Sequence, residues 1–419
     1  MRYGCLRLQY LDCVYYKLIM RFFKQIILLL LIGCSLSSIA HGQQVRNIGE
    51  AIRQGEGQLA LSISSSDPAV VQIVRRAFSL HGGIRLIDGQ AASFNLNFES
   101  RSSRSVQLII SSGQPLQQQL SREIFGDDFQ HAVLRACDVA VEATLASPGF
   151  FAGKIAFVGK QRGVSELYSS DLLFSRVRAL TADRSLVTGP SWSADGQKLL
   201  YTTYFKNGLP DIYMMDFTTR RRLPIATYQG TNTGAELSPD GSQIVMSLSS
   251  EAGNEIYLSD RNGKNLRRVT RNKSLESSPT WSPDGSQLVF ESDAAGKPQL
   301  YIIPASGGNM RRLPTNISSY CAEPSWNPRQ PDLLVFTVAV AGGFQLALYD
   351  MSTRQSKIVT SQLGSAMEPE WLNDGRHILF TLRQQGRSSL AILDRISGRI
   401  KPLHKSSFGD ASSGSFVYP

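Results

Sequence analysis

The 419-residue sequence lacks the short motifs that bring reactive or metal-binding side chains together. Its histidines stand apart, and it contains no His-Glu-x-x-His segment and no paired Cys-x-x-Cys segment. It also lacks a phosphate-binding glycine loop and the Gly-x-Ser-x-Gly turn that exposes a serine nucleophile. These absences argue against catalysis, and we predict no catalytic residue, no bound cofactor and no dedicated metal-binding motif.

Cysteine is scarce, with five residues in the whole chain. Cys5, Cys13 and Cys34 fall within the first 42 residues, whereas Cys137 and Cys321 are far apart in the remainder. Two distant cysteines do not form a disulfide framework, although an oxidising compartment would permit a single bond. We therefore expect Cys137 and Cys321 to be buried free thiols.

A repeated motif is what the sequence has in abundance. Its clearest copy is Trp281-Ser282-Pro283-Asp284-Gly285, a large residue followed by a turn. Equivalent large residues, which we call the anchors, are Trp192, Leu237, Trp281, Trp326, Trp371 and Phe416, so the successive steps are 45, 44, 45, 45 and 45 residues. A period of roughly 40–50 residues is typical of propellers and solenoids.

The contents of one period distinguish these two architectures. After Trp281, Pro283 and Gly285 suit the second and closing positions of a β-turn. Three further short β-rich runs follow at 288–292, 299–303 and 311–313, with turn residues between them and no helical period. Four short antiparallel strands per repeat predict a propeller blade. The anchors themselves are expected to fill the core between blades.

Two incomplete units at the ends of the repeat region complement each other. Residues 154–158, 166–168 and 177–180 read as a blade that lacks its first strand, and residues 415–418 read as a strand that lacks a blade. We predict that the C-terminal strand completes the first blade, because this closes a six-bladed ring and leaves no open sheet edge around it.

The first 42 residues read as a leader. Met20 is a better start than Met1, because it precedes Arg21, Lys24 and a short apolar run at 26–32. The run is too short to span a bilayer and suits a secretory signal peptide, with cleavage expected after Gly42. The alternative is a lipoprotein processing site with lipid on Cys34. Both interpretations predict export, and we expect a periplasmic protein.

Residues 43–147 show a different pattern and predict a small α/β domain. Strands are expected at 59–63, 84–87, 94–98 and 106–110. Asp67 and Pro68 suit the first positions of a helix, and a second helix is expected from about Asp127 to Leu145. The expected organisation is a multi-domain protein: the leader, this α/β domain, a hinge at 148–152 and the six-bladed β-propeller at 153–419.

The formal net charge of +10 raises the question of a nucleic-acid partner. Basic groups such as Arg221-Arg222, Arg267-Arg268 and Arg311-Arg312 fall on the fourth strand of each predicted blade. Exposed edge strands commonly carry Lys and Arg, which prevent edge-to-edge pairing. Because these groups point outward around a ring, we predict no nucleic-acid partner and a monomeric protein.

The motif and the layout together resemble one family. The segment Pro-x-Trp-Ser-Pro-Asp-Gly-Ser-x-Leu-x-Phe at 279–290 is similar to the propeller repeat of the TolB family, as is the order of leader, α/β domain and six blades. The resemblance implies a non-enzymatic periplasmic component of the Tol–Pal system, which supports outer-membrane integrity and envelope constriction during cell division. It also implies that the propeller binds the peptidoglycan-associated lipoprotein Pal and that the N-terminal region binds TolA.

The predicted partner site lies at one mouth of the central channel. Residues three positions before the anchors enter the innermost strands there, and loops at a rigid rim commonly bind partners. The resemblance implies Pal contacts within 231–234 and 277–280. The predicted partner-binding residues are Thr231, Gly234, Glu276, Ser277, Ser278, Glu323 and Glu368, and the predicted N-terminal partner segment is Gln43, Gln44 and Val45.

Other interpretations of this mouth stay open. Glu323 and Glu368 can contact a partner, hold a divalent cation, or form a solvated rim. The alternative function is an exported propeller enzyme or a carbohydrate-binding protein that uses the same mouth.

Overall fold

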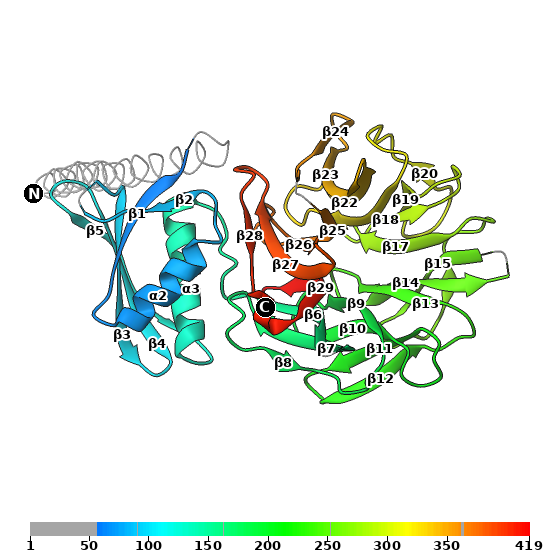
Figure 1. The fold of residues 1–419 in the computed structure, drawn as a ribbon, viewed down its shortest axis with the longest axis horizontal. Helices are drawn as coiled ribbons and strands as arrows, with labels where there is room; N and C mark the ends of the chain where they lie inside the picture. Colours follow the sequence, from blue (N-terminus) through cyan, green and yellow to red (C-terminus); the bar gives the residue numbers. More distant parts are fainter. Residues whose placement is uncertain (1–56, 90, 162, 252, 362–363) are drawn as a thin grey trace, which may run out of the picture.

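The structure is a computed structural model that describes residues 57–419, except residues 90, 162, 252, 362 and 363. A small α/β domain is followed along the chain by a β-propeller (Figure 1). The predicted leader, including Cys34, and the predicted partner segment Gln43, Gln44 and Val45 lie outside the described residues. Within the described residues, no helix is long and apolar enough to cross a membrane.

The N-terminal domain is a five-stranded sheet in the order β2-β1-β3-β4-β5. Strand β1 pairs in parallel with β2 and β3, whereas β3, β4 and β5 are antiparallel. Helices α2 and α3 lie between this sheet and the propeller (Figure 1). The elements are β1 (Leu59–Ser64), α2 (Pro68–Phe78), β2 (Ile84–Leu86), β3 (Phe94–Ser102), β4 (Ser105–Ser112), β5 (Gln117–Phe125) and α3 (Phe129–Leu145).

Helix starts follow the expected chemistry. The Asp67 carboxylate accepts a hydrogen bond from the Ala69 amide at 2.9 Å, and Pro68 begins α2. Asp128 caps α3 in the same way by accepting from the His131 amide at 2.9 Å. Strand β5 was not expected, because it is an edge strand on which nearly every side chain is exposed and no apolar alternation marks it.

The propeller has six four-stranded blades, as predicted. Blades 1 to 3 are β9 (Val187–Trp192), β10 (Lys198–Thr203), β11 (Asp211–Asp216) and β12 (Arg221–Ala226); β13 (Asn232–Leu237), β14 (Gln243–Ser250), β15 (Gly253–Asp260) and β16 (Arg267–Arg268); and β17 (Glu276–Trp281), β18 (Gln287–Ser292), β19 (Gln299–Pro304) and β20 (Arg311–Arg312). Blades 4 and 5 are β21 (Cys321–Trp326), β22 (Leu333–Val340), β23 (Gly343–Asp350) and β24 (Gln355–Ile358); and β25 (Ser365–Trp371), β26 (His377–Gln384), β27 (Arg387–Asp394) and β28 (Ile400–Pro402). Blade 6 is β29 (Asp410–Val417), β6 (Lys154–Gln161), β7 (Val164–Asp171) and β8 (Arg178–Ala179), and a 3-10 turn, η1 (Ser406–Phe408), precedes β29.

The C-terminal strand closes the ring. Strand β29 lies beside β6 (Figure 1) and pairs antiparallel with it. Phe416 is opposite Ile155, and Val417 is opposite Lys154. Each innermost strand contacts the innermost strands of both neighbouring blades, which completes a circle around a central channel. The predicted closure is confirmed.

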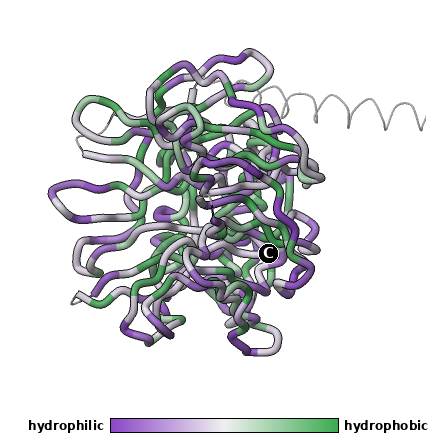
Figure 2. The backbone as a smooth tube through the Cα atoms, turned by 90° about the vertical axis from the view of Figure 1, so that its right-hand side faces the viewer, coloured by the Kyte–Doolittle hydropathy of each residue, from purple (hydrophilic) through white to green (hydrophobic). Residues whose placement is uncertain are grey.

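The anchor turns and anchor side chains have structural roles. In blade 3 the Asp284 carboxylate accepts hydrogen bonds from the Ser282 hydroxyl at 2.5 Å and the Ser286 amide at 3.1 Å, and Gly285 supplies a φ of 72°. Trp281 is buried between blades 2 and 3. Hydrophobic segments run through the interior of the propeller, while hydrophilic ones gather at the loops (Figure 2). Cys137 and Cys321 are buried free thiols, as expected.

The N-terminal domain docks on one end of blades 5 and 6. In an antiparallel blade, the turn after the first strand and the turn after the third strand lie at the same end. The domain meets turns of this kind: Arg76 Nη2 donates to the Leu173 carbonyl at 2.6 Å, and Asp128 pairs with Arg176. The end of the channel at which the innermost strands begin therefore faces away from this domain, and we call it the channel mouth.

Candidate functional site at the channel mouth

Each innermost strand contains a β-bulge three residues before its anchor. At these positions two residues oppose one on the neighbouring strand, as at the register shift between Ser277 and Thr280. The backbone there is left-handed, a region that favours glycine and strains other residues by about 1–2 kcal/mol. The six bulge residues are Gly189, Gly234, Ser278, Glu323, Glu368 and Ser413, with φ between 49° and 63°.

Glutamates at two of the bulges link neighbouring blades. Glu323 Oε2 accepts hydrogen bonds from the Thr337 hydroxyl at 2.7 Å and from the Glu368 amide of the next blade at 2.8 Å. Glu368 Oε2 repeats the pattern with the Thr381 hydroxyl at 2.6 Å and the Ser413 amide at 2.8 Å. Each carboxylate therefore accepts a hydrogen bond from the bulge amide of the next blade, and the Ser413 amide also donates to the Thr381 hydroxyl at 2.9 Å.

In blade 3 the carboxylate of this pattern comes from the second strand. The bulge residue there is Ser278, and Glu291 Oε2 accepts from the Glu323 amide at 3.1 Å. The Ser277 hydroxyl also donates to Glu291. We call Glu291, Glu323 and Glu368 the acidic arc, because they occupy three consecutive blades. Sequence reasoning missed Glu291, since the position that pairs with the residue just before the bulge holds Thr or Ser in the equivalent strands β10, β14, β22 and β26.

The arc creates a site of negative potential. Burial, followed by the nearby Glu368 and Glu291 carboxylates, raises the pKa of Glu323 to about 7. The negative charge of these two neighbours, which helps to raise the pKa of Glu323, would be offset by an incoming positive charge. A basic side chain of a partner or a bound cation is therefore the group that this part of the channel favours.

A second tier of polar side chains lies one residue before the anchors. Glu236 Oε1 accepts from the Trp281 amide at 3.3 Å, and Glu370 Oε1 accepts from the Phe416 amide at 2.6 Å. Burial raises the pKa of Glu236 to about 7. Burial, with a further contribution from Glu236, raises the pKa of Glu370 to about 8. Both carboxyls therefore gain from being protonated in the folded protein.

Glu370→Gln should gain stability relative to the wild type as the pH rises. The folded pKa of about 8 exceeds the ordinary value of 4.5, so the stabilising contribution of Glu370 is present below pH 4.5 and is lost as the pH rises toward 8. Glutamine keeps an acceptor for the Phe416 amide and does not titrate. Urea unfolding at pH 5, 6.5 and 8 gives the free energy of unfolding of both proteins. The value for Glu370→Gln minus that for the wild type should grow by about 1 kcal/mol or more from pH 5 to pH 8. A difference that is constant over this range would mean that folding does not perturb Glu370.

The structure brings most of the predicted partner-binding residues to the channel. Gly234, Ser278, Glu323 and Glu368 occupy bulges, and Ser277 binds the arc. Thr231 precedes β13, and its amide donates to the Ser249 hydroxyl at 2.7 Å.

Glu276 lies apart from the other predicted residues, because its side chain is fully buried between blades 2 and 3. Its carboxylate accepts from the Ser292 hydroxyl at 2.8 Å, and burial raises its pKa to about 7, with the neighbouring Glu255 adding to the shift. The buried Glu276 side chain is therefore not available to a partner at the channel mouth.

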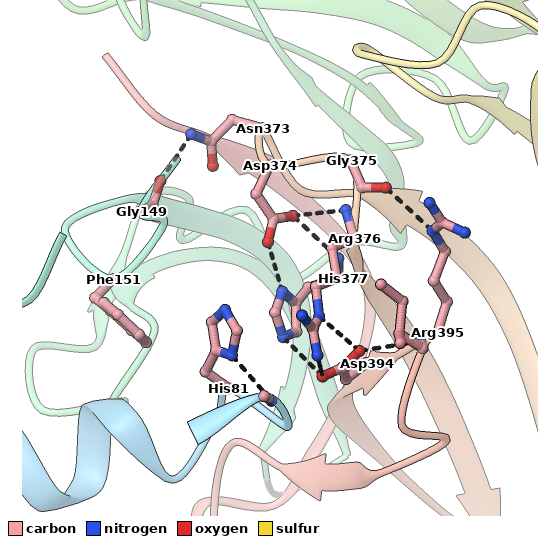
Figure 3. Close-up of polar contacts among 12 residues, drawn as sticks. His81, Gly149, Phe151, Asn373, Asp374, Gly375, Arg376, His377, Asp394 and Arg395 are labelled. Carbon is pink, nitrogen blue, oxygen red and sulfur yellow. Dashed lines mark hydrogen bonds and ion pairs between the residues drawn. The ribbon is translucent and has the colours of Figure 1, made fainter. Parts of the chain in front are cut away.

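Among residues 57–419 as described, one group of three possible metal ligands comes close together, and it lies at the domain interface rather than in the channel. Ligand atoms of His81, His377 and Asp394 lie within 4.8 Å of one another, and all three side chains are buried (Figure 3). Sequence reasoning missed this group, because each histidine stands alone in the sequence.

The bonding at this interface does not fit a metal. Both oxygens of Asp394 accept hydrogen bonds from Arg376, at 2.9 and 2.7 Å (Figure 3). His81 Nδ1 accepts from the Gly83 amide at 3.1 Å, so the neutral ring carries its proton on Nε2 and has no lone pair there for a metal. A divalent cation would also lie next to the Arg376 guanidinium. The group is therefore a buried cluster of titratable side chains rather than a metal centre.

Comparison with known proteins identifies the propeller. The sequence pattern of the PD40 family, described as the TolB beta propeller domain, matches residues 141–416. The Tol-Pal system protein TolB of Anaeromyxobacter dehalogenans is 30% identical over 155 residues, which is 37% of this chain and 35% of the relative. That of Desulfosudis oleivorans is 33% identical over 144 residues, 34% of this chain and 32% of the relative. The chain thus spans about a third of the length of the curated relatives it matches.

The fold extends the likeness beyond the aligned repeats. The crystal structure of TolB from Acinetobacter baumannii superimposes with a TM-score of 0.76, covering 86% of this chain and 97% of the other at 21% identity. At this identity the superposition speaks for the fold, and it includes residues outside the propeller.

Proposed function

Because the chain belongs to the PD40 family of TolB β-propeller domains, we propose that it is a TolB-like scaffold of the Tol–Pal system in the periplasm, without a catalytic role. The propeller binds a Pal-like peptidoglycan-associated lipoprotein, and the N-terminal region, including Gln43, Gln44 and Val45, binds a TolA-like inner-membrane protein. In this role the protein supports outer-membrane integrity and envelope constriction during cell division.

The acidic arc is the observation that carries the proposed propeller contact. Glu291, Glu323 and Glu368 gather negative charge on three adjacent blades around the channel. The channel mouth faces away from the docked N-terminal domain, so a partner reaches it without displacing that domain. Blades fix the position of each carboxylate, and a partner with a complementary basic group is bound without reorganisation of the site.

A divalent cation is the second ligand that we propose for the arc. Carboxylate oxygens suit hard cations such as Mg²⁺ and Ca²⁺. A cation and a basic partner side chain compete for the same charge, so partner affinity should depend on the divalent cation concentration.

Glu323→Lys should abolish or strongly weaken partner binding. The change replaces the central carboxylate of the arc by a positive charge, which repels a basic group of the partner. Placing like charges together at such a contact costs several kcal/mol. The soluble domain of the organism's own peptidoglycan-associated lipoprotein is the probe, and calorimetric titration gives the dissociation constant. We expect at least a tenfold increase in Kd for Glu323→Lys and a smaller one for Glu323→Gln, which keeps an acceptor for the Glu368 amide.

The matched control is Asp332→Lys, an identical charge change at an exposed position at the opposite end of the same blade. This variant should bind like the wild type. Equal weakening by both variants would indicate a general charge effect, and unaltered binding by Glu323→Lys would move the contact off the channel mouth. An enzyme or carbohydrate-binding protein using this mouth would leave the lipoprotein unbound by every variant.

A further inference from the structure

The N-terminal domain meets blade 5 through a tight backbone contact at the loop after α2 (Figure 3). A Cβ atom on Gly82 would lie 2.3 Å from Asp394 Oδ2 and 2.1 Å from Ser397 Oγ, so only glycine fits there. The adjacent His81 ring packs against the His377 ring, with centroids 4.7 Å apart, and stacks on Phe150 of the hinge at 6.1 Å. The side chain of His81 is fully buried by this docking.

Hydrogen bonds at the interface define where the protons lie. The Gly83 amide donates to His81 Nδ1, and buried His81 Nε2 has no hydrogen-bond partner. His377 Nδ1 lies 2.5 Å from Asp374 Oδ2, and Asp394 is bound by Arg376. One proton on the His81 ring satisfies this arrangement, because Nδ1 must stay free to accept from Gly83.

We propose that His81 makes the docking of the N-terminal domain sensitive to acid: uptake of a second proton on its ring loosens the contact with blade 5. The added proton goes to Nδ1, which removes the acceptor of the Gly83 amide and leaves a buried cation. When the domains separate, water solvates the charged ring instead.

The charges around His81 oppose this protonation in the docked state. Burial, then the nearby His377 and Arg376, hold the pKa of His81 well below its ordinary value of 6.5, against the pull of Asp394 and Asp374. Those two carboxylates are already engaged by Arg376 and His377, and Arg395 adds positive charge to the same cluster. Helix α2 and the loop after it offer no compensating negative charge, because their charged residues, Arg75 and Arg76, are both positive.

The direction of the pH effect on docking follows from the linkage between docking and proton binding by His81. A base with a lowered pKa when docked contributes stability that is present above its ordinary pKa and is lost as the pH falls below it. The docking equilibrium constant should therefore decrease below pH ~6.5, by at most about tenfold per pH unit, because one proton is taken up. Asp138 also lies at the interface, and burial raises its pKa to about 7, so its contribution has the opposite sign.

Hydrogen–deuterium exchange of the hinge tests the proposal. The Phe151 and Ala152 amides bind Asp138 at 2.7 and 3.0 Å, and domain separation exposes them. Exchange is followed from pH 7.5 to 5 and corrected for its intrinsic pH dependence. The comparison is between wild type and His81→Asn, whose amide oxygen replaces Nδ1 as acceptor for Gly83 and takes up no proton. The contribution of Asp138 is common to both proteins and cancels.

We expect the protection factors of the hinge amides to fall in the wild type, relative to those in His81→Asn, by up to about tenfold per pH unit below pH 6.5. The control is His131→Asn, which changes another histidine of the same domain whose Nδ1 also accepts a backbone amide, that of Asp127. It should respond like the wild type. Parallel pH profiles for wild type and His81→Asn would overturn the proposal. Ring signals of ¹³C-labelled histidine in the unmodified protein provide a second check, since His81 must remain neutral at pH 6 while docked.

Discussion

Removal of residues 414–419 should lower the melting temperature by about 10 °C, since the loss of one large buried side chain alone costs about 3–5 kcal/mol and each kcal/mol is about 2–4 °C for a domain of roughly 150–250 residues. The deletion takes away Phe416 and Val417, which are buried in the strand that completes blade 6. It also exposes the edge of β6 to solvent and to pairing with other chains.

The deletion removes contacts on both sides of the closing strand. The Ser415 hydroxyl accepts from the Trp192 amide of blade 1 at 3.1 Å, and the Tyr418 hydroxyl donates to Asp138 of α3 at 3.0 Å. The strand thus joins blade 6, blade 1 and the N-terminal domain, so its loss weakens all three connections together. Differential scanning calorimetry is the measurement, and deletion of the exposed Pro419 alone is the control that should leave the transition unchanged. A truncated chain as stable as the full one would refute the contribution of ring closure.

Asp394→Ala should destabilise the protein by about 3–5 kcal/mol, the usual effect of leaving one partner of a buried ion pair uncompensated. The Arg376 side chain is 6% exposed, and its guanidinium donates to both oxygens of Asp394. Without the carboxylate it remains buried at the domain interface among His81 and His377. Chemical denaturation monitored by circular dichroism gives the free energy of unfolding.

An exposed ion pair in the same protein serves as the reference. Arg75 and Asp88 lie 3.3 Å apart with side chains that are 49% and 91% exposed. Asp88→Ala should change stability by less than about 1 kcal/mol, because solvent screens such a pair. The double variant Asp394→Ala with Arg376→Met should recover part of the loss, since it removes the unpaired charge. Equal effects of the two single Ala changes would mean that the interface admits water freely.

The blade count could be read from the sequence because its signals are local. Trp281 and the turn at Pro283 and Gly285 recur at one period, and each turn closes through its own hydrogen bonds. The closure by Phe416 followed from two incomplete units that complement each other. Strand β5 was not predicted because an exposed edge strand carries no alternating pattern, and it forms through pairing with β4 and contacts with α3.

The site was only partly predictable because its contacts cross between blades. Glu323 and Glu276 both precede an anchor, yet one lies in the channel and the other is buried next to Glu255. The side-chain direction depends on the bulge, which interrupts the simple alternation of a strand. Glu291 belongs to the arc through the amide of the next blade, and no local pattern reports that relation. The pairing of His81 with His377 likewise depends on the docking of two domains.

Each of the six bulges holds its residue in the left-handed region, whether that residue is glycine, serine or glutamate. Glycine is the relaxed residue there, so Glu323 and Glu368 carry a backbone strain that glycine would avoid. Because the ring accepts all three residue types at one backbone geometry, the side chain that a single blade presents to the channel can differ without a change in the rest of the ring.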